Sequence, residues 1–466
     1  MFPPSDQVLT AAQMRAAEAV LIAGGISVAE LMDRAGRGAA EWVWRIGGGR
    51  SVTVLTGPGN NGGDGWVIAE AIREKGGDVV VIAAAEPATP AARDARARYH
   101  GAVLQADAKR HGEVFVDCLF GTGLTRALGQ DHAALLTRLA AAHHKCVAID
   151  LPSGIESDLG QGLGHGLPAY DLTVALGAWK PAHFLMPAAA QMGALRLAGI
   201  GLEPVAGSAR VVSRPKLSAP ADDAHKYTRG MLGVVVGAMP GAATLAASAA
   251  QGAGTGYVKL FGAAETHVPC DLVVDSQPLA EALLDKRISA LLVGPGLGRD
   301  SAARETLAVV LSEQRPAVLD ADALVLLGPR SLAERNAPLI ATPHEGELFS
   351  LERAFDLDGS GSKADRALGL AKAANMVVVA KGPDSVVAAP DGQVAFAPRG
   401  VSWLSTAGTG DVLAGTIASR LACGVEGFEA ACQGLWLHAE AARLCPPAFR
   451  AAELAAQVRS AYAACL

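Results

Sequence analysis

The sequence predicts an α/β protein with two domains. Short apolar runs of strand length, such as 51–55 and 231–236, each precede a glycine-bearing loop and a helical segment. This alternation is typical of parallel sheets covered by helices. It fades over 201–223, where Pro, Ala and short polar residues dominate and a linker is expected. We therefore expect an N-terminal Rossmann-like, doubly wound domain over 1–208 and a second α/β domain over 222–466.

The composition narrows the class of protein. The 466 residues, at a soft prior of about 150 per domain, correspond to two or three domains. Hydrophobic residues make up 50% and charged residues 18%, which supports large buried cores and argues against disorder. A net charge of −6 leaves no electrostatic footprint for nucleic acid. No run of about 18 uncharged apolar residues predicts a membrane span.

The N-terminus and the cysteines indicate the compartment. The first residues lack the basic region and apolar core of a signal peptide. The 7 cysteines form no CxxC pair, and most lie in apolar segments. We therefore expect a cytoplasmic protein whose cysteines are reduced and serve packing.

In the first domain, a capping box over 10–13 opens a helix that runs to about residue 23. Two more helices are expected over 28–44 and 66–75, and strands over 51–55, 78–84, 114–117, 146–150 and 171–176. The loop over 57–65 separates the first of these strands from its helix. Such β-loop-α-β units predict a parallel sheet.

Polar residues recur where these strands end. Asn61, Asp117, Asp150, Ser153 and Lys180 each follow or close an expected strand. Because ligands bind at the carboxyl ends of strands in open α/β sheets, these residues predict a site at one edge of the sheet.

The loop over 57–65 satisfies GxGxxG, which alone is weak evidence for a dinucleotide site. Glu86 is a candidate for the acidic residue that follows the next strand, so a dehydrogenase stays open. The run from Asn60 to Asp64 holds two amides and a carboxylate, which favours polar recognition beyond a backbone cradle. The alternative is a turn in which Asp64 caps the next helix.

Asn61, Asp117 and Ser153 supply oxygen donors, and only one of the three is charged. They suit a weakly charged hard cation, such as K⁺, better than zinc, which prefers His and Cys. The alternative is that Asp117 and Asp150 only cap their loops.

The second domain repeats the α/β pattern. Its expected strands are 231–236, 257–261, 290–293, 317–319, 338–341 and 376–379, with a hairpin over 386–396; its expected helices are 242–252, 300–313, 345–356, 362–373, 412–421, 425–443 and 449–463. Glycine-bearing loops at 294–298, 342–347, 381–385 and 405–411 follow or join these elements.

The loop over 405–411 places free backbone N–H groups at a helix start, a natural seat for phosphate. Asp411 falls where a carboxylate meets a substrate hydroxyl beside that phosphate; the alternative is an N-cap. Lys381 either reaches a phosphate or is solvated. A histidine in the position of His344, considered alone, is more often a hydrogen-bonded loop residue than a ligand-binding one. No GxxxxGK[ST] occurs, which excludes a P-loop, so a divalent ion would bridge the nucleotide phosphates.

These motifs together resemble a known family. The first half resembles the NAD(P)H-hydrate epimerase domain through GPGNNGGDG at 57–65, DCLFGTGL at 117–124 and DLPSG at 150–154. The second half is similar to the ribokinase-like NAD(P)H-hydrate dehydratase domain through HKYTRG at 225–230, GPGLG at 294–298, PHEGE at 343–347, KGPDS at 381–385 and STAGTGDVLAG at 405–415. The whole chain resembles the bacterial bifunctional NAD(P)H-hydrate repair family, in the family's order.

The resemblance implies two activities and their ligands. The first domain would interconvert R and S hydrates of NADH or NADPH, and the second would dehydrate the S form using Mg²⁺ and ADP. By resemblance, the hydrate binds in the first domain through Asn60, Asn61, Gly62, Gly63, Asp64, Gly121, Thr122, Gly123, Leu124, Thr125, Arg126, Ala127 and Asp150, while Asn61, Asp117 and Ser153 hold K⁺. In the second domain, Ala242, Gly296, His344 and Asp411 bind the hydrate, and Lys381, Gly382, Pro383, Asp384, Ser385 and Gly410 bind the adenine nucleotide.

The implied chemistry makes Asp411 the general base of the dehydratase, and either Asp150 or Lys180 the proton shuttle of the epimerase. The chain departs from the family pattern at Ala182, where glycine is usual, and at 345–346, where proline and glycine are usual. The first departure weakens the Lys180 assignment. We also expect a homo-oligomer. Two alternatives stay open: a ribokinase-like small-molecule kinase fused to a dinucleotide-binding domain, and a catalytically silent binding module.

Overall fold

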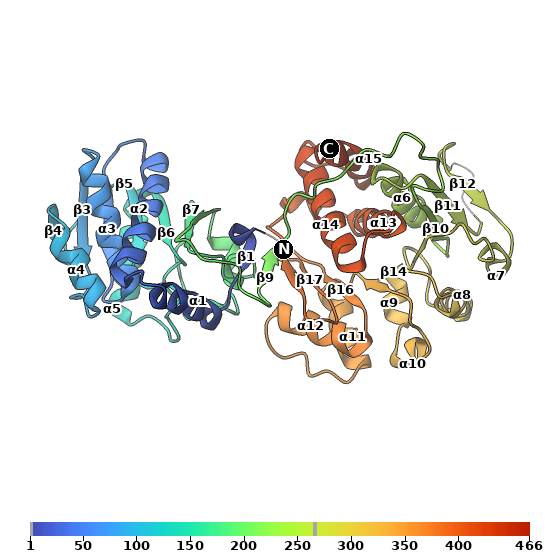
Figure 1. Ribbon diagram of the computed structural model, residues 1–466, viewed down its shortest axis with the longest axis horizontal. Coiled ribbons are helices and arrows are strands. Elements are labelled where there is room, and N and C mark those ends of the chain that lie inside the picture. The colour runs from blue at the N-terminus through green and yellow to red at the C-terminus, as the bar shows by residue number, and fades with distance from the viewer. Residues whose placement is uncertain (1–2, 264–267) are drawn as a thin grey trace. The chain divides into compact units, whose positions relative to one another are not determined.

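The computed structural model describes residues 3–263 and 268–466. The chain divides into two compact units, Met1–Arg210 and Val211–Leu466. The division falls within 201–223, the segment expected to be a linker. Figure 1 shows both units, and each is an α/β fold in its own right.

The first unit holds a 7-stranded sheet in the order β4-β3-β2-β5-β6-β7-β8, in which every neighbouring pair is parallel. The strands are β2 (Val52–Thr56), β3 (Val79–Ala83), β4 (Ala102–Leu104), β5 (Gly112–Cys118), β6 (His143–Ile149), β7 (Leu172–Leu176) and β8 (Ala194–Ala198). The helices are α1 (Ala11–Ala23), α2 (Val28–Gly47), α3 (Asn60–Glu74), α4 (Pro90–Arg98) and α5 (Gln130–Ala141). A short antiparallel pair joins β1 (Gln7–Val8) to β9 (Ala209–Val211).

Helices cover both faces of this sheet, as the doubly wound expectation requires. Because strand side chains alternate, Val114 and Val116 of β5 enter the core beneath α2 and α3. Phe115 points to the opposite face and packs in the core that contains Leu136 of α5. The near-continuous apolar strands therefore reflect burial on both sides.

The expected loop over 57–65 is wrong in its second half, because α3 begins at Asn60 rather than at residue 66. Its glycines serve close packing inside the helix. A Cβ at Gly62 would lie 1.9 Å from the carbonyl oxygen of Gly57, and one at Gly65 would lie 2.8 Å from Cβ of Cys118. The glycine-rich composition that suggested a turn therefore lets the helix start approach β2 and β5 closely.

The second unit builds one sheet in the order β18-β17-β16-β15-β14-β13-β10-β11-β12. The strands are β10 (Met231–Val235), β11 (Tyr257–Phe261), β12 (Val273–Asp275), β13 (Ala290–Val293), β14 (Ala317–Leu319), β15 (Leu339–Ala341), β16 (Val377–Ala380), β17 (Val386–Ala388) and β18 (Val394–Phe396). Neighbours from β12 to β16 are parallel, and β16, β17 and β18 pair antiparallel, which confirms the expected hairpin.

Figure 1 shows α6, α13, α14 and α15 grouped on one side of this sheet. The helices are α6 (Pro240–Gly252), α7 (Leu279–Ala282), α8 (Ser301–Ser312), α9 (Asp322–Leu326), α10 (Pro329–Leu332), α11 (Glu345–Ala354), α12 (Lys363–Ala374), α13 (Thr409–Ala422), α14 (Gly427–Leu444) and α15 (Ala451–Ala463). Helix α13 is buried almost throughout and lies against α6: a Cβ at Gly415 would meet the carbonyl oxygen of Ala246 at 2.0 Å. This packing fixes the start of α13 relative to the sheet.

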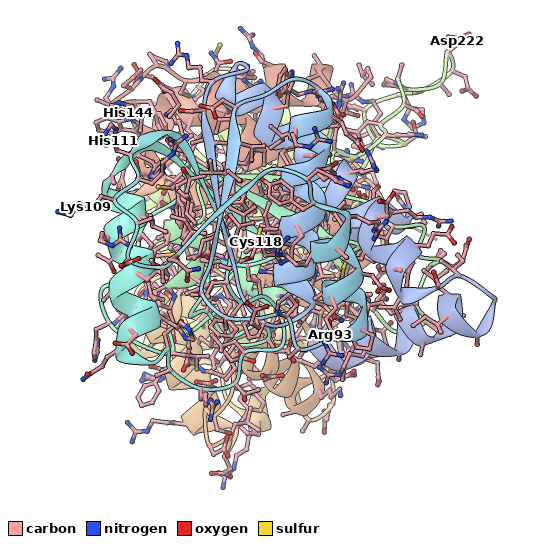
Figure 2. The ribbon with its side chains drawn as sticks, turned by 90° about the vertical axis from the view of Figure 1, so that its left-hand side faces the viewer. Arg93, Lys109, His111, Cys118, His144 and Asp222 are labelled. Atoms are coloured by element: carbon pink, nitrogen blue, oxygen red, sulfur yellow. The ribbon has the colours of Figure 1, made fainter. Side chains whose placement is uncertain are left out.

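The expectation that the cysteines serve packing is wrong for Cys270, which is exposed, and Cys423 and Cys445 are only half-buried. In Figure 2, Cys118 lies in the interior, whereas Lys109, His111 and His144 lie at the periphery. All seven cysteines are free thiols, and Cys118, Cys146, Cys432 and Cys465 are buried. Across residues 3–263 and 268–466, no helix is long and apolar enough to cross a membrane.

Candidate functional sites

The first site lies at the carboxyl edge of the first sheet. Strands β2, β5, β6 and β7 are neighbours in that order, so the residues that follow them gather at one edge. A cavity of about 560 Å³ opens there, a size suited to a small molecule. The expected site residues that line it are Asn60, Asn61, Asp64, Gly121, Thr122, Gly123, Leu124, Asp150 and Lys180. Gly62, Gly63, Thr125, Arg126 and Ala127 belong to the same two segments but do not line the cavity.

Asp150 and Lys180 form a buried ion pair in this cavity. Lys180 Nζ donates to Asp150 Oδ1 at 2.5 Å and to the carbonyl oxygen of Leu176 at 2.7 Å. The backbone N–H of Thr122 donates to Asp150 Oδ2 at 3.0 Å, and its hydroxyl donates to the same oxygen. Burial opposes the charge, but Lys180 and these hydrogen bonds hold the pKa of Asp150 below its ordinary value.

The backbone of Asp150 reinforces this geometry. Its φ of 65° is uncommon for a residue with a side chain and fits a tightly held turn. The Asp150 carbonyl oxygen lies 2.8 Å from Nε2 of His183, whose Nδ1 accepts the backbone N–H of Lys180. Burial lowers the pKa of His183 to about 4, so His183 is neutral. Neutral His183 therefore hydrogen-bonds to the backbone of both Asp150 and Lys180 and holds the two residues in position.

Asp117 is fully buried and fully hydrogen-bonded. Its Oδ1 accepts from Ser153 Oγ at 2.7 Å and from the N–H of Leu119 at 3.1 Å. Its Oδ2 accepts from the Tyr170 hydroxyl at 2.6 Å and from the N–H of Ser153 at 3.0 Å. Burial raises the pKa of Asp117 despite these donors. Asp117 therefore joins the loops after β5 and β6, and Tyr170 is a partner that the sequence analysis missed.

Asn61 differs from Asp117, because both polar atoms of its side-chain amide are buried and lack a hydrogen-bond partner. A Cβ at Gly121 would lie 3.2 Å from Cγ of Asn61 and 2.9 Å from Oδ2 of Asp150. An unpaired buried amide is unfavourable unless a ligand satisfies it. Asn61 thus fits an oxygen ligand of a bound cation or a contact to a polar substrate.

Asp64 and Glu18 are two further carboxyl groups that line the cavity. Asp64 lies within α3, whose N-cap is Gly59, so the alternative that Asp64 caps this helix is wrong. Burial raises the pKa of Asp64 well above its ordinary value, and Asp150 and Glu18 add to that rise. Burial also raises the pKa of Glu18. Glu18 was not predictable from the sequence, since nothing in α1 alone shows that one of its faces lines a cavity.

The second site lies at the carboxyl edge of the second sheet. Helix α13 begins at Thr409, after the N-cap Gly408, which has a φ of 89° and makes no side-chain cap. Asp411 lies in the first turn, so the alternative in which Asp411 is the N-cap is wrong. The N–H of Thr409 donates to the carbonyl oxygen of Thr406 at 3.4 Å. A helix start with glycines beside it is the geometry on which the expected anion seat depends.

Asp411 is half-buried and faces two charged groups. Burial and, to a smaller extent, the charge of Asp320 raise its pKa to about 6 against the opposing charge of Lys381. A carboxylate with this pKa is largely ionised at neutral pH and accepts a proton readily. The expected Lys381 therefore lies within electrostatic reach of Asp411.

Asp320 is a residue that the sequence analysis missed. It follows β14 directly and is buried, and its Oδ1 accepts from Lys381 Nζ and from Thr342 Oγ1, each at 2.6 Å. A Cβ at Gly410 would lie 3.5 Å from Lys381 Nζ. Asp320 thus holds Lys381 beside the start of α13. Its position at a strand end is the same signal that singled out Asp117 and Asp150.

His438 is a second missed residue of this site. It is buried on α14, and its Nε2 lies 2.9 Å from the carbonyl oxygen of Thr409. Burial lowers the pKa of His438 to about 4, so the neutral ring donates this hydrogen bond. No pattern around His438 in the sequence pointed to the α13 turn.

The loop over 381–385 is held by its own contacts. Ser385 Oγ accepts the N–H of Gly382 at 3.1 Å and donates to the Gly382 carbonyl oxygen at 2.8 Å. Asp384 is buried and forms an ion pair with Lys363 at the start of α12. Asp384 and Ser385 therefore shape the loop, and Lys381 is its member closest to the start of α13.

Of the remaining expected residues, Gly296 lies in the loop after β13, Ala242 in the first turn of α6 and His344 at the N-cap of α11. The N–H of Met239 donates to the carbonyl oxygen of Gly296 at 2.9 Å, and a Cβ at Gly296 would meet Cβ of Ala242 at 3.1 Å. His344 caps α11: its Nδ1 accepts from the N–H of Gly346 at 3.0 Å. The neutral ring then carries its proton on Nε2, and the side chain is exposed.

The fold and these two sites define a protein with a cavity at the sheet edge of a doubly wound domain and a glycine-rich helix start at the sheet edge of a second α/β domain. A family model described as NAD(P)H-hydrate dehydratase matches residues 232–462, and one described as YjeF-related protein N-terminus matches residues 28–182. The bifunctional NAD(P)H-hydrate repair enzyme Nnr of Mycobacterium tuberculosis H37Rv is 35% identical over 438 residues, which cover 90% of this chain and 89% of that protein. The chain belongs to the family of bifunctional NAD(P)H-hydrate repair enzymes.

Other relatives agree. The enzyme of the same name from Mycobacterium leprae is 33% identical, with 93% of both chains covered. A solved structure, the ADP/ATP-dependent NAD(P)H-hydrate dehydratase from Bacillus subtilis co-crystallised with ATP/Mg²⁺, is 28% identical and covers 54% of this chain and 95% of its own, with a TM-score of 0.47. The two family models and the two mycobacterial relatives confirm the family resemblance, against the dehydrogenase, kinase and silent-module alternatives. The two sheets of the structure confirm the two-domain α/β fold class.

Proposed function

We propose that this bifunctional repair enzyme epimerises R and S NAD(P)H hydrate in the cavity of its first domain and dehydrates the S form at the start of α13. The observation that carries the second assignment is Asp411, held in the first turn of a buried helix with Lys381 nearby. The cavity that joins Asn61, Asp64 and the Asp150–Lys180 pair supports the first.

The dehydration would begin with phosphorylation, because hydroxide is a poor leaving group and phosphate is a good one. Asp411 accepts the proton of the substrate hydroxyl as that oxygen attacks the terminal phosphate of the nucleotide. The N–H groups at the start of α13 and the Lys381 ammonium stabilise the charge on the transferred group. The ring nitrogen then expels phosphate and regenerates the dihydronicotinamide.

We assign the adenine nucleotide to Gly410 and the loop over 381–385, and the hydrate to Ala242, Gly296, His344 and Asp411. Among the described residues, no group of three or more His, Cys, Asp or Glu side chains is placed to hold a metal ion. Mg²⁺ would enter bound to the phosphates of the nucleotide, where it would neutralise charge. We propose ADP as the phosphate donor.

For the first domain, we assign the hydrate to the segments 60–64 and 121–127 and to Asp150. We assign K⁺ to Asn61, Asp117 and Ser153. The unpaired Asn61 amide supports the K⁺ assignment, and the Asp117 carboxylate supplies negative charge in the same loop cluster. Bound K⁺ would supply a fixed positive charge that orients polar groups of the hydrate. A homo-oligomer in the cytoplasm remains part of the proposal.

The test is incubation of the full chain with mixed R/S NADH hydrate and either ADP or ATP, following the absorbance of regenerated NADH. We expect complete conversion with the preferred nucleotide. Asp411→Asn should stop NADH formation yet leave R/S interconversion, which is measured by chromatography of the hydrates. The exposed Asp222→Asn serves as the matched control and should behave as wild type. Loss of interconversion in Asp411→Asn would contradict the assignment of two independent sites.

A further inference from the structure

The Asp150–Lys180 pair is poorly suited to move a proton. Each Asp150 oxygen already accepts strong donors, from Lys180 on one side and from Thr122 on the other. The pKa of Asp150 is below its ordinary value, so its carboxylate is a weak base. Lys180 is 1% exposed and is committed to Asp150 and to the Leu176 carbonyl. The Asp150–Lys180 pair is therefore better suited to stabilise charge on a bound substrate through its fixed charges than to donate or accept a proton.

Asp64 has the opposite surroundings. Asp64 is 8% exposed and lines the same cavity, and its pKa is shifted by burial and neighbouring charges alone, with no hydrogen bond among the causes. The contrast with Asp117, which accepts from four donors, is sharp. A buried carboxyl group without a donor favours its neutral, protonated form.

The charges around Asp64 act in the same direction. Asp150, beyond the end of β6, and Glu18, on α1, place negative charge near it, and only Lys180 opposes them. Arg15 on α1 lines the cavity too, and its charge opposes the rise in the pKa of Glu18. Three carboxyl groups thus share one cavity with a lysine that is already paired with Asp150. Burial and these neighbouring charges therefore favour the protonated form of Asp64.

We propose that Asp64, as a neutral carboxylic acid, is the general acid of the epimerase. It donates its proton to the hydroxyl of the hydrate while the C–O bond breaks, water leaves and the electron pair of the ring nitrogen forms an iminium. Water then adds to the opposite face of the ring and gives up a proton, which returns to the Asp64 carboxylate. The product is the other epimer, and acid and water are both regenerated. This proposal rests on the proposed function of the first domain.

The Asp150–Lys180 pair then has a separate role. Its fixed charges lie in the same cavity as the ring, where the Asp150 carboxylate stabilises the positive iminium. A protonated acid beside an ionised carboxylate is the division of labour that acid-catalysed loss of water needs. The Asn61 amide, close to Gly121 and Asp150, stays available to the substrate or a cation.

The experiment compares wild type, Asp64→Asn and Asp64→Glu in the full chain, each supplied separately with R and S NADH hydrate and ADP or ATP. Asp64→Asn should lower kcat for R-hydrate repair by about 100-fold or more, with S-hydrate repair unchanged. Asp64→Glu should restore a large part of the rate. The exposed Asp94→Asn, on α4, is the matched control and should retain full activity.

Two readouts separate acid catalysis from a structural or binding role. The wild-type rate of R-hydrate repair should fall at high pH as Asp64 ionises, and Asp64→Asn should lack that limb. In water enriched in ¹⁸O, epimerisation should proceed with uptake of ¹⁸O into the hydroxyl group. A raised KM with unchanged kcat in Asp64→Asn, or epimerisation without ¹⁸O uptake, would overturn the proposal. Wild type that fails to interconvert the epimers would instead refute the proposed function.

If Asp64→Asn destabilises the first domain, Asp64→Glu still decides the matter. Its longer carboxyl group keeps an acid in the cavity, so activity with a shifted high-pH limb supports the proposal. A folded, substrate-binding Asp64→Glu variant without that limb would overturn it.

Discussion

Lys381 donates from Nζ to Asp320 Oδ1 at 2.6 Å, and this contact joins the loop after β16 to the residue that follows β14. Thr342, after β15, donates to the same Asp320 oxygen. Three neighbouring strand ends are therefore tied together beneath the start of α13. The ammonium of Lys381 is held in place by Asp320, so the proposed binding of a phosphate there would need little further ordering of this side chain.

Asp320→Asn should shift the acid limb of S-hydrate dehydration to lower pH. The charge of Asp320 raises the pKa of Asp411, and its loss also frees Lys381, which lowers that pKa. The measurement is kcat/KM for S-hydrate against pH, and the released Lys381 should raise KM for the nucleotide. If the acid limb of kcat/KM stays at the same pH or moves to higher pH, Asp320 does not raise the pKa of Asp411. Asp222→Asn provides the baseline.

The wild-type enzyme should lose dehydratase activity as pH falls through about 6. Asp411 must be ionised to accept the hydroxyl proton, and its pKa is raised to about 6, mainly by burial. Below that pH, kcat/KM should fall by about tenfold per unit. The phosphates of the nucleotide titrate in a similar range, but their pKa does not depend on residue 320. The comparison with Asp320→Asn therefore separates the two.

Much of the sheet architecture was predictable, because buried parallel strands produce short apolar runs whatever their neighbours. The strands at 257–261, 290–293 and 317–319 match the structure residue for residue. The start of α3 was not predictable from local composition. Its glycines suggest a loop, but they serve contacts with Gly57 and Cys118, which are set by tertiary packing.

The residues of the candidate sites likewise fall into those that the sequence predicts and those that it does not. Because residues that follow parallel strands meet at the carboxyl edge of the sheet, Asn61, Asp150 and Lys180 were expected there. In the structure these three residues line one cavity. The same logic applied to 317–319 would have found Asp320. Glu18 and His438 lie on helices, and each reaches its site only because a distant segment packs against it. No local pattern carries that information.

Removal of K⁺ should slow epimerisation and spare dehydration. If Asn61 is a cation ligand, Asn61→Ala should raise the K⁺ concentration for half-maximal R-hydrate repair by about tenfold or more. The measurement is the R-hydrate repair rate during titration with K⁺ at constant ionic strength, with tetramethylammonium as the replacement. S-hydrate repair in the same samples is the internal control. Equal K⁺ dependence in Asn61→Ala and wild type would exclude Asn61 as a ligand.

Asp64→Asn should change how the stability of the first domain depends on pH. The pKa of Asp64 in the folded protein is raised above its unfolded value of about 4. At a pH between the unfolded and the folded pKa, the native state therefore binds more protons than the unfolded state. Stability contributed by Asp64 is therefore fully present below pH 4 and is lost as pH rises through the folded pKa. Asparagine has no proton to lose, so the variant should be flatter over that window and more stable than wild type above it.

The measurement is thermal unfolding of the full chain from pH 5 to pH 9, with Asp94→Asn as the matched control. Glu18, whose pKa is also raised by burial, contributes a slope of the same sign, and Asp64→Asn should leave that part in place. The gap between Asp64→Asn and the control should therefore widen with pH. A constant gap would show that Asp64 is ionised in the folded protein at neutral pH. That result would remove the acid on which the epimerase proposal depends.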